Sequence, residues 1–538
     1  MDTINLNPLS YGRSSFTFIR EQQMIYVDKT ALIAEIAKQS VPLFLSRPRR
    51  FGKSLLINTF SSLFADGLKY FNGLEIEKIW MDKTYHVIHL DFSRMTDGSQ
   101  NLKIKLGESI INKFKMKGIV DLDASYGIRT PDSILNDICE KLENNSIVLL
   151  IDEYDAPITY NINDLKELNK IIKILDTFYA TIKEHFEKFR FVFITGITRT
   201  SHVSMFSTFN NLKDLSLIKD YNSLLGFTYD DLEKYFDAHI ENASRILKMN
   251  KIDVYQRLQD YYDGYKFSFE ADETVYTPWS ILSFLDRPQD GFRNYWFQSG
   301  GISSFIMNYL KITDDFDFLT FNTNDLIVDY YTLCNKYDIT NIPNYILLYQ
   351  AGYFTIKTIN SDIARLILAN REAESSLYRL YLLANNLTPK STLKKMMLMI
   401  SSAIDNKQLS TIINIFNKIL NQCVSSLSKI FNDERSVRDI IYAALTYIPS
   451  LRVIKEHDTA HGKSDLEIFT GKTYFIVEFK RTYPQTRSAS QALKLAINQV
   501  KQNRYVIVFS QNCNIYRVAM VVSTEQKTIL QDYCQEVL

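Results

Sequence analysis

Short apolar runs that alternate with longer amphipathic stretches dominate the first 225 residues. Each run is apolar at nearly every position, as expected for strands buried on both faces of a parallel sheet. The runs lie at residues 42–46, 86–92, 146–151 and 191–195, and helix-period patterns lie at 53–66, 101–117, 131–144 and 164–186. Strands that alternate with helices predict βαβ units, so this region should form a parallel sheet covered by helices.

The pattern changes after residue 225 and again after residue 430. The middle of the chain reads as helical, and from residue 431 a helix, three short strands and a second helix precede strands at 504–510 and 514–522. At roughly 100–200 residues per domain, 538 residues allow several domains. We therefore predict an α/β protein with a parallel-sheet domain (1–225), a helical lid (226–310), a helical spacer (311–430) and a C-terminal α/β domain (431–538).

Composition excludes several classes of protein. Lys and Arg total 62 against 61 Asp and Glu, so no basic excess indicates a nucleic-acid binder, and such a function must come from local sites. The five cysteines are too sparse for a disulfide scaffold. The N-terminus lacks a secretion-signal pattern, and no uncharged apolar run approaches the roughly 18–20 residues of a membrane span. These features predict a cytoplasmic protein without a membrane partner.

The loop RPRRFGKS at residues 47–54 follows the first predicted strand and precedes a helix. Strand, loop, Gly-Lys-Ser and helix is the context of a P-loop. Lys53 would reach the β- and γ-phosphates of ATP and Ser54 would bind Mg²⁺, while the helix start at Gly52 and Leu55 would offer backbone N–H groups. Arg50 would serve the phosphates or the protein core. Arg47 occupies the place of the first glycine of the motif, so this loop alone leaves the assignment open.

An acidic pair and a polar strand end complete the predicted nucleotide site. Asp152 and Glu153 follow the strand at 146–151, where Asp152 could bind Mg²⁺ and Glu153 could activate the attacking water. Carboxylates that merely cap a strand are the alternative. The next strand ends at Thr195, and either Thr195 or Arg199 could sense the γ-phosphate, although a surface turn with a solvated arginine is equally consistent. The order of the pieces favours an ATP site.

Several motifs of this half resemble the bacterial AAA-ATPase-like family. They are YVDKT (26–30), FLSRPRRFGKSLL (44–56), LIDEYDAPI (150–158), FSTFNNLKDLSL (206–217), YYDGYKF (261–267), YTPWSIL (276–282) and NYWFQS (294–299). Members of that family similarly have Arg in place of the first glycine. The resemblance implies a P-loop domain of AAA type that binds ATP. It also implies that Arg199 and the segment from Tyr261 face the nucleotide or a neighbouring subunit.

Two carboxylates and a lysine define a second candidate site. Asp465 lies on one predicted strand and Glu478-Phe479-Lys480 on the next. If the chain turns at Gly471, Asp465 and Glu478 meet at the same end of adjacent strands, and strand alternation puts Glu478 and Lys480 on one face. Such a group could bind one or two Mg²⁺ ions and promote phosphodiester hydrolysis. Solvated strand ends in a hairpin are the alternative.

The surrounding layout resembles the PD-(D/E)XK nuclease superfamily over residues 431–520. Glu434 starts the preceding helix, and the following helix carries Gln491 and Gln499. The resemblance implies that Asp465 and Glu478 are metal ligands and that Lys480 orients water, with Glu434 and Glu456 as secondary candidates. Lys463 and Ser464 depart from the superfamily pattern, which has Arg and Pro at these positions.

Together, these features predict a nuclease that binds ATP and requires Mg²⁺, with Mn²⁺ as an alternative ion. The expected partner is nucleic acid, with DNA favoured over RNA but the choice left open, and homo-oligomerisation stays open. The P-loop domain would gate or drive the nuclease domain. Two alternatives remain: an ATP-dependent switch or interaction protein with an inactive nuclease domain, and an ATPase remodelling factor that only grips nucleic acid. A role in defence or in mobile elements is what the family resemblance implies.

Overall fold

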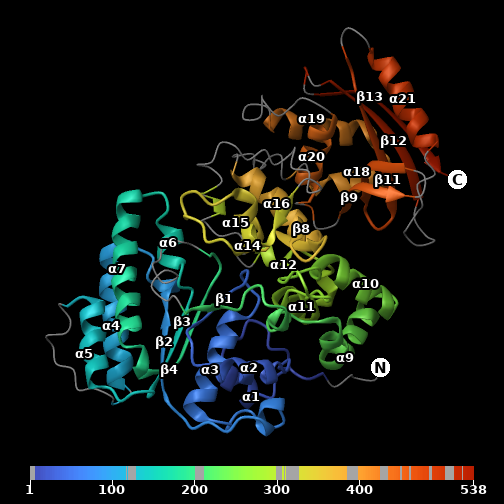
Figure 1. Ribbon diagram of the computed structural model, residues 1–538. Helices are drawn as coiled ribbons and strands as arrows, with labels where there is room; N and C mark the ends of the chain where they lie inside the picture. Colours follow the sequence, from blue (N-terminus) through green and yellow to red (C-terminus); the bar gives the residue numbers. More distant parts are fainter. Residues whose placement is uncertain are drawn as a thin grey trace. The chain divides into compact units, whose positions relative to one another are not determined.

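The chain divides into two compact units, each described here by itself (Figure 1). The first unit contains Met1–Tyr309 and Asn322–Glu374, and the second contains Leu310–Phe321 and Ser375–Leu538. The computed structural model describes residues 6–116, 129–199, 211–298, 326–384, 398–423, 434–446, 451–459, 462–483, 487–502, 514–523 and 528–537, with a few single residues between them. No helix in these ranges is both long and apolar enough to cross a membrane.

The first unit is built on a parallel five-stranded sheet in the order β2-β3-β4-β1-β5. Its strands are β1 (Leu43–Ser46), β2 (His86–Asp91), β3 (Ile147–Asp152), β4 (Phe189–Gly196) and β5 (Lys213–Asp214). Every residue of β1 and β3 is buried, which explains why both read as continuous apolar runs. The four predicted strands and their parallel arrangement are confirmed, and β5 at the sheet edge is an addition.

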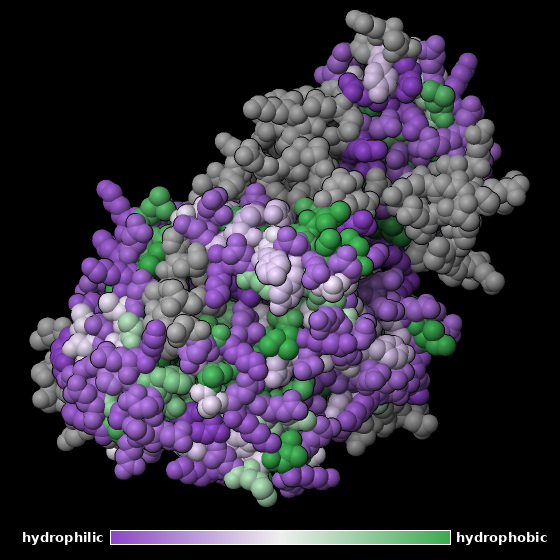
Figure 2. All heavy atoms as spheres, viewed as in Figure 1, coloured by the Kyte–Doolittle hydropathy of each residue, from purple (hydrophilic) through white to green (hydrophobic). Residues whose placement is uncertain are grey.

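Helices cover both faces of this sheet (Figure 1). One face carries α4 (Ser99–Met116), α5 (Pro131–Lys141) and α7 (Leu165–Glu184), and the other carries α3 (Lys53–Asp66). Phe60 and Phe64 of α3 pack against Phe191 of β4, with ring centroids 5.1 and 5.0 Å apart. The same unit contains α1 (Phe16–Glu21), α2 (Thr30–Ala37), α6 (Ala156–Tyr160), α14 (Tyr330–Cys334) and α15 (Asn344–Ala351). Among the coloured residues of the face that Figure 2 shows, polar side chains predominate.

The region predicted as a helical lid is largely helical in its described part. It contains α9 (Tyr229–Leu247), α10 (Lys251–Tyr262), α11 (Pro278–Asp286) and α12 (Tyr295–Gln298). Thr228 starts α9 with a capping box, in which its hydroxyl accepts from the N–H of Asp231 and the Asp231 carboxylate accepts from the N–H of Thr228. These helices bury a hydrophobic cluster of their own, which holds α11 at one wall of the cavity described below.

The prediction of an all-helical spacer at 311–430 is wrong in its first half. β6 (Ile327–Asp329), β7 (Phe354–Thr358) and β8 (Ile363–Leu368) form an antiparallel sheet in the order β6-β8-β7. The run IARLIL of β8 is apolar at five of six positions, so periodicity could not separate a strand from a buried helix, and pairing with β7 decided it. Residues 322–374 also belong to the first unit. The other bounds of the four predicted parts stay a prediction.

The second unit contains a mixed sheet in the order β13-β12-β11-β10-β9. β9 (Arg452–Thr459), β10 (Gly462–Phe469) and β11 (Thr473–Arg481) form an antiparallel meander, and β12 (Asn514–Ser523) runs parallel to β11. The edge strand β13 (Thr528–Val537) is an addition, and the predicted strand at 504–510 lies outside the described residues. The helices are α18 (Ile400–Asp405), α19 (Leu409–Cys423), α20 (Glu434–Leu445) and α21 (Ala489–Gln502). The predicted order of helix, meander, helix and strand is confirmed.

Candidate nucleotide-binding and nuclease sites

The P-loop connects β1 to α3 and wraps around the ammonium group of Lys53. Gly52, with a φ of +100°, precedes the first residue of α3, a conformation that a side chain would strain. Lys53 is 7% exposed, and its Nζ donates to the carbonyl oxygens of Arg47 (2.9 Å) and Pro48 (3.0 Å). Burial lowers the pKa of Lys53, against the opposing effect of the nearby Glu153 and Asp152 carboxylates.

The acidic pair at the end of β3 lies beside this loop. The Ser54 hydroxyl hydrogen-bonds to the Asp152 carboxylate, which also accepts from the backbone N–H of Glu153 at 3.0 Å. Glu153 adopts a φ of +51°, which is uncommon for a residue with a side chain. Burial raises the pKa of both carboxyl groups. The fold thus brings together the predicted residues Lys53, Ser54, Asp152 and Glu153.

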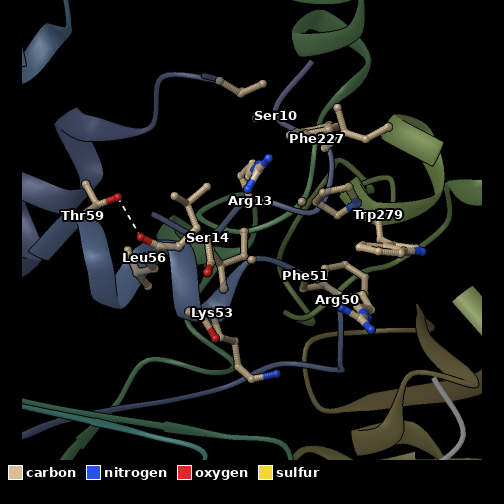
Figure 3. Close-up of a pocket in the computed structure, with 18 of the residues that line it drawn as sticks. Ser10, Arg13, Ser14, Arg50, Phe51, Lys53, Leu56, Thr59, Phe227 and Trp279 are labelled. Atoms are coloured by element: carbon tan, nitrogen blue, oxygen red, sulfur yellow. Dashed lines mark hydrogen bonds between the residues drawn. The ribbon is translucent and has the colours of Figure 1, made fainter. Parts of the chain in front are cut away.

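A cavity of about 580 Å³ opens next to the P-loop (Figure 3). Its volume lies in the range of ligand pockets. One wall is the loop and helix start from Arg49 to Leu56, with Glu153 beside it. The other walls are residues 10–14, residues 224–227 and the lid helix α11. The Arg50 guanidinium lies 4.2 Å from the ring centre of Trp279, a residue of α11, so Arg50 joins the loop to the lid.

Arg47 takes a structural role at the position of the missing glycine. It is 2% exposed and donates to the carbonyl oxygens of Ser46 (2.9 Å), Ser216 (2.8 Å) and Tyr221 (2.9 Å). Its guanidinium also lies 4.1 Å from the ring centre of Phe267. Burial lowers its pKa to about 10. Arg47 therefore ties the P-loop to the segment after β5 through its side chain.

Arg47→Ala is expected to lower the melting temperature of the protein by about 5–10 °C. The substitution leaves buried carbonyl groups without their donor and removes a cation–π contact, a loss of about 3 kcal/mol in the free energy of unfolding. Scanning calorimetry of the full chain measures the change in melting temperature. The exposed Arg94 is the matched control, and its replacement by Ala should leave the melting temperature within about 1 °C. Equal effects of the two substitutions would contradict the structural role of Arg47.

The two predicted γ-phosphate sensors do not line the cavity. The Thr195 hydroxyl is buried in β4 without a hydrogen-bond partner among the described residues. Arg199 is 5% exposed, pairs with the Asp214 carboxylate and donates to the carbonyl oxygen of Leu333 at 2.8 Å. Arg199 is therefore a buried ion-pair partner rather than the solvated arginine of the alternative interpretation. A sensor role for either residue stays a prediction.

Two residues near the P-loop escaped the sequence analysis as site residues. The indole Nε1 of Trp296 donates to the carbonyl oxygen of Arg49 at 3.3 Å. The Glu372 carboxylate accepts from the backbone N–H of Trp296 (2.8 Å) and from the hydroxyl of Ser280 (2.7 Å). Trp296 lies in the motif NYWFQS, so the family resemblance could have indicated it. Glu372 lies in the region predicted as a helical spacer, where no motif indicates a site residue.

The thermal stability of the protein is expected to fall between about pH 5 and pH 8 partly because of Glu372. Burial raises its pKa to about 8, far above the range of an unfolded glutamate. The folded chain therefore holds a proton that the unfolded chain releases, so stability falls as pH rises through this window. Melting temperatures measured from pH 5 to 8.5 should fall less steeply for Glu372→Gln than for the wild type. Parallel curves would contradict the shifted pKa.

The second candidate site lies on the hairpin of β10 and β11. The chain turns at Gly471 (φ +97°), and Leu466 pairs with Val477, so Asp465 lies next to Glu478 on adjacent strands. The Asp465 carboxylate accepts from the backbone N–H of Phe479 at 2.8 Å. The predicted hairpin and the meeting of these two carboxylates are confirmed.

Lys480 completes this group and changes its electrostatics. Its Nζ lies 3.1 Å from Oε1 of Glu478, which is 1% exposed. Burial and the neighbouring Asp465 carboxylate raise the pKa of Glu478 to about 8, and burial raises that of Asp465. Burial lowers the pKa of Lys480, but the carboxylates outweigh it and the net shift is upward. Two crowded, partly desolvated carboxylates favour a bound cation.

Helix α20 contributes further side chains to the hairpin. Glu434 Oε1 lies 3.5 Å from Lys480 Nζ, and Oε2 accepts from the backbone N–H of Arg481 at 3.0 Å, so this secondary candidate joins the group. The Glu456 side chain lies outside the described residues. Arg438, which the sequence analysis missed, lies 3.8 Å from Asp465 Oδ1 and pairs with Asp439 at 2.8 Å. Arg438 and Asp439 lie about one helical turn after Glu434 on α20.

The carboxylate oxygens of Asp465 and Glu478 are the atoms that would bind a metal ion at the hairpin. In the described ranges no three His, Cys, Asp or Glu side chains are arranged to hold a metal ion. Asp465 and Glu478 would hold Mg²⁺ as a pair, and this suits an ion that commonly keeps several waters and binds through one or two carboxylates and substrate phosphates. At the P-loop, Ser54 and Asp152 form a second oxygen pair of this kind.

Comparisons with known proteins match the two units separately. The family described as predicted AAA-ATPase matches residues 10–206, and the PD-(D/E)XK nuclease superfamily matches residues 432–532. The chain combines an AAA-ATPase-like domain with a PD-(D/E)XK nuclease superfamily domain. The boundaries of the nuclease superfamily domain enclose Asp465, Glu478 and Lys480, and those of the AAA-ATPase-like domain enclose the P-loop and the acidic pair.

A curated relative matches the chain across both domains. It is an uncharacterized protein from the vnfD 5' region of Azotobacter chroococcum mcd 1, 28% identical over 506 residues. The match covers 92% of each chain, so it extends over residues that both family models match in this chain.

Proposed function

We propose that this protein is an ATP-binding, Mg²⁺-dependent nuclease that hydrolyses phosphodiester bonds in nucleic acid, with DNA as the expected substrate. The observation that carries the proposal is the group on β10 and β11. There, Asp465 and Glu478 lie side by side and Lys480 Nζ lies 3.1 Å from Glu478. Its position inside a domain of the PD-(D/E)XK superfamily supports a nuclease rather than a structural hairpin.

Each residue of the group has a separate task in this reaction. Asp465 and Glu478 would hold Mg²⁺, which when bound would polarise the phosphate and lower the pKa of a coordinated water. Lys480 orients the attacking water and neutralises the charge that develops on the phosphate oxygens. The Glu434 carboxylate pairs with the ammonium group of Lys480 and holds it in place. The backbone N–H of Phe479 fixes the orientation of the Asp465 carboxylate.

The AAA-ATPase-like domain supplies the proposed ATP site. Lys53 is released from the loop carbonyls to bind the β- and γ-phosphates, and Ser54 and Asp152 bind the Mg²⁺ of the nucleotide. Glu153 activates water, which its raised pKa supports because a base with a pKa nearer neutrality transfers protons more effectively. Occupancy of this site gates the nuclease domain in our proposal.

A direct assay tests the function. Purified full-length protein is incubated with linear, circular and single-stranded DNA and with RNA, in Mg²⁺, Mn²⁺ or EDTA, with and without ATP. We expect Mg²⁺-dependent cleavage of DNA that changes with ATP. Cleavage in EDTA would contradict the metal dependence. An absence of cleavage on all substrates, with ATP binding retained, would favour the ATP-dependent switch instead.

A further inference from the structure

Glu372 has a buried carboxyl group and belongs to neither group of proposed catalytic residues. It is the second residue of α16 (Arg371–Ala384) and is 1% exposed. Its Oε2 accepts from the Ser280 hydroxyl at 2.7 Å, and its Oε1 accepts from the backbone N–H of Trp296 at 2.8 Å. Its own carbonyl oxygen accepts from the Asn294 amide at 3.1 Å. A buried carboxyl group with both oxygens hydrogen-bonded holds its partners in a defined geometry.

Both partners of Glu372 lead to the nucleotide cavity. Ser280 lies on α11, the lid helix whose residues Pro278, Trp279 and Leu282 line the cavity. Trp296 donates from its indole Nε1 to the carbonyl oxygen of Arg49 in the P-loop. Glu372 therefore contacts the lid helix directly at Ser280 and reaches the P-loop through one residue, Trp296.

The P-loop is held from a second direction at the neighbouring residue. A Cβ atom at Gly352, between α15 and β7, would lie 2.7 Å from Cβ of Pro48, so this turn is packed closely against the loop. Gly352 has a φ of +93°, which favours glycine there. The Trp296 ring packs edge-on against Tyr353, with centroids 5.1 Å apart. The Pro48 ring of the loop thus lies against a turn, and the neighbouring Arg49 carbonyl is hydrogen-bonded to an indole.

We propose that Glu372 is a positioning residue of the nucleotide site: through Trp296 and Ser280 it keeps the P-loop backbone at Arg49 and the lid helix α11 in the arrangement that binds the phosphate chain. This inference rests on the proposed binding of ATP. It concerns the phosphate end of the site, because Arg49 precedes the Gly52-Lys53-Ser54 segment. Helix α16 continues past Glu374, where the first unit ends, so the contact lies where the chain leaves the nucleotide-binding unit.

Binding of ATP and AMP to variants of the full chain tests the inference. Trp296→Phe removes the indole donor and keeps a ring, and Glu372→Ala removes both acceptors. Each should weaken ATP binding about tenfold and AMP binding less than twofold, since a displaced P-loop affects chiefly the β- and γ-phosphates. Glu372→Gln is the matched control: its amide can accept from Trp296 and donate to Ser280, so both affinities should stay within about twofold.

The double variant shows whether the two residues act in series. If Glu372 acts through Trp296, combining Trp296→Phe with Glu372→Ala should weaken ATP binding little more than Glu372→Ala alone. Equal losses for ATP and AMP, full additivity, or unchanged ATP binding would overturn the inference while the proposed function stands. A wild-type protein that does not bind ATP would overturn both. If Glu372→Ala does not fold, Ser280→Ala replaces it and should give a several-fold selective loss of ATP binding.

Discussion

Asp465→Asn is expected to reduce the rate of DNA cleavage about a thousandfold, equivalent to about 4 kcal/mol of transition-state stabilisation. Asparagine has nearly the same shape and its side-chain oxygen can still accept from the backbone N–H of Phe479. The hairpin should therefore stay intact, and the loss falls on the negative charge that binds the metal ion. Initial rates at saturating Mg²⁺, measured on one linear DNA, give the value.

The control for this prediction is an aspartate of the same sheet outside the site. Asp532 lies on the edge strand β13 and is exposed, and Asp532→Asn should leave the cleavage rate within about twofold. Binding of Mn²⁺ or Ca²⁺ by calorimetry provides a readout that does not depend on turnover, and Asp465→Asn should weaken it. Cleavage at the wild-type rate by Asp465→Asn would contradict the assignment of the site, whatever the substrate.

Lys53→Ala is expected to weaken ATP binding about a hundredfold and to remove the effect of ATP on cleavage. The ammonium group is the cation at the centre of the loop, and hydrogen bonds to charged groups contribute about 1.5–3 kcal/mol each. Lys53 also donates to the carbonyls of Arg47 and Pro48, so a small fall in melting temperature should accompany the loss. Competition with a fluorescent ATP analogue measures the affinity.

The matched control is Lys69, an exposed lysine after the end of α3. Lys69→Ala should bind ATP with the wild-type affinity. Cleavage that responds to ATP equally in the wild type and in Lys53→Ala would separate the two domains functionally and would remove the gating part of the proposal. In the absence of ATP, Lys53→Ala should cleave DNA at the wild-type rate. That result agrees with the gating proposal, because the nuclease group does not contain Lys53.

The parallel sheet and the nuclease hairpin were predictable because local patterns specify them. Strands β1 and β3 are buried at every position, and such runs admit few other interpretations when helices alternate with them. The turn at Gly471 sets the register of β10 and β11, and the register determines that Asp465 meets Glu478. The strand β8 was missed because its apolar run has no distinguishing period.

The site residues also divide into those that the sequence predicts and those that only the structure reveals. Lys53, Ser54, Asp152 and Glu153 come together because each follows or precedes a strand at the same edge of one parallel sheet, which sequence order reveals. Arg199 had an equally suggestive position after β4, but Asp214 of the edge strand β5 pairs with it. Nothing local to residue 199 predicts a partner that is brought close only by the pairing of β5 with β1.

The sequence by itself determined two candidate sites in this protein, a P-loop with an acidic strand end and a hairpin with two carboxylates and a lysine. Both depend on residues a short distance from a strand or a turn, where local geometry orients the side chains. The tertiary structure alone decided the role of Arg47 and the contact of Glu372 with Trp296 and Ser280. These groups lie 76 to 174 positions apart, and only packing of the whole unit buries them together so that their hydrogen bonds become obligatory.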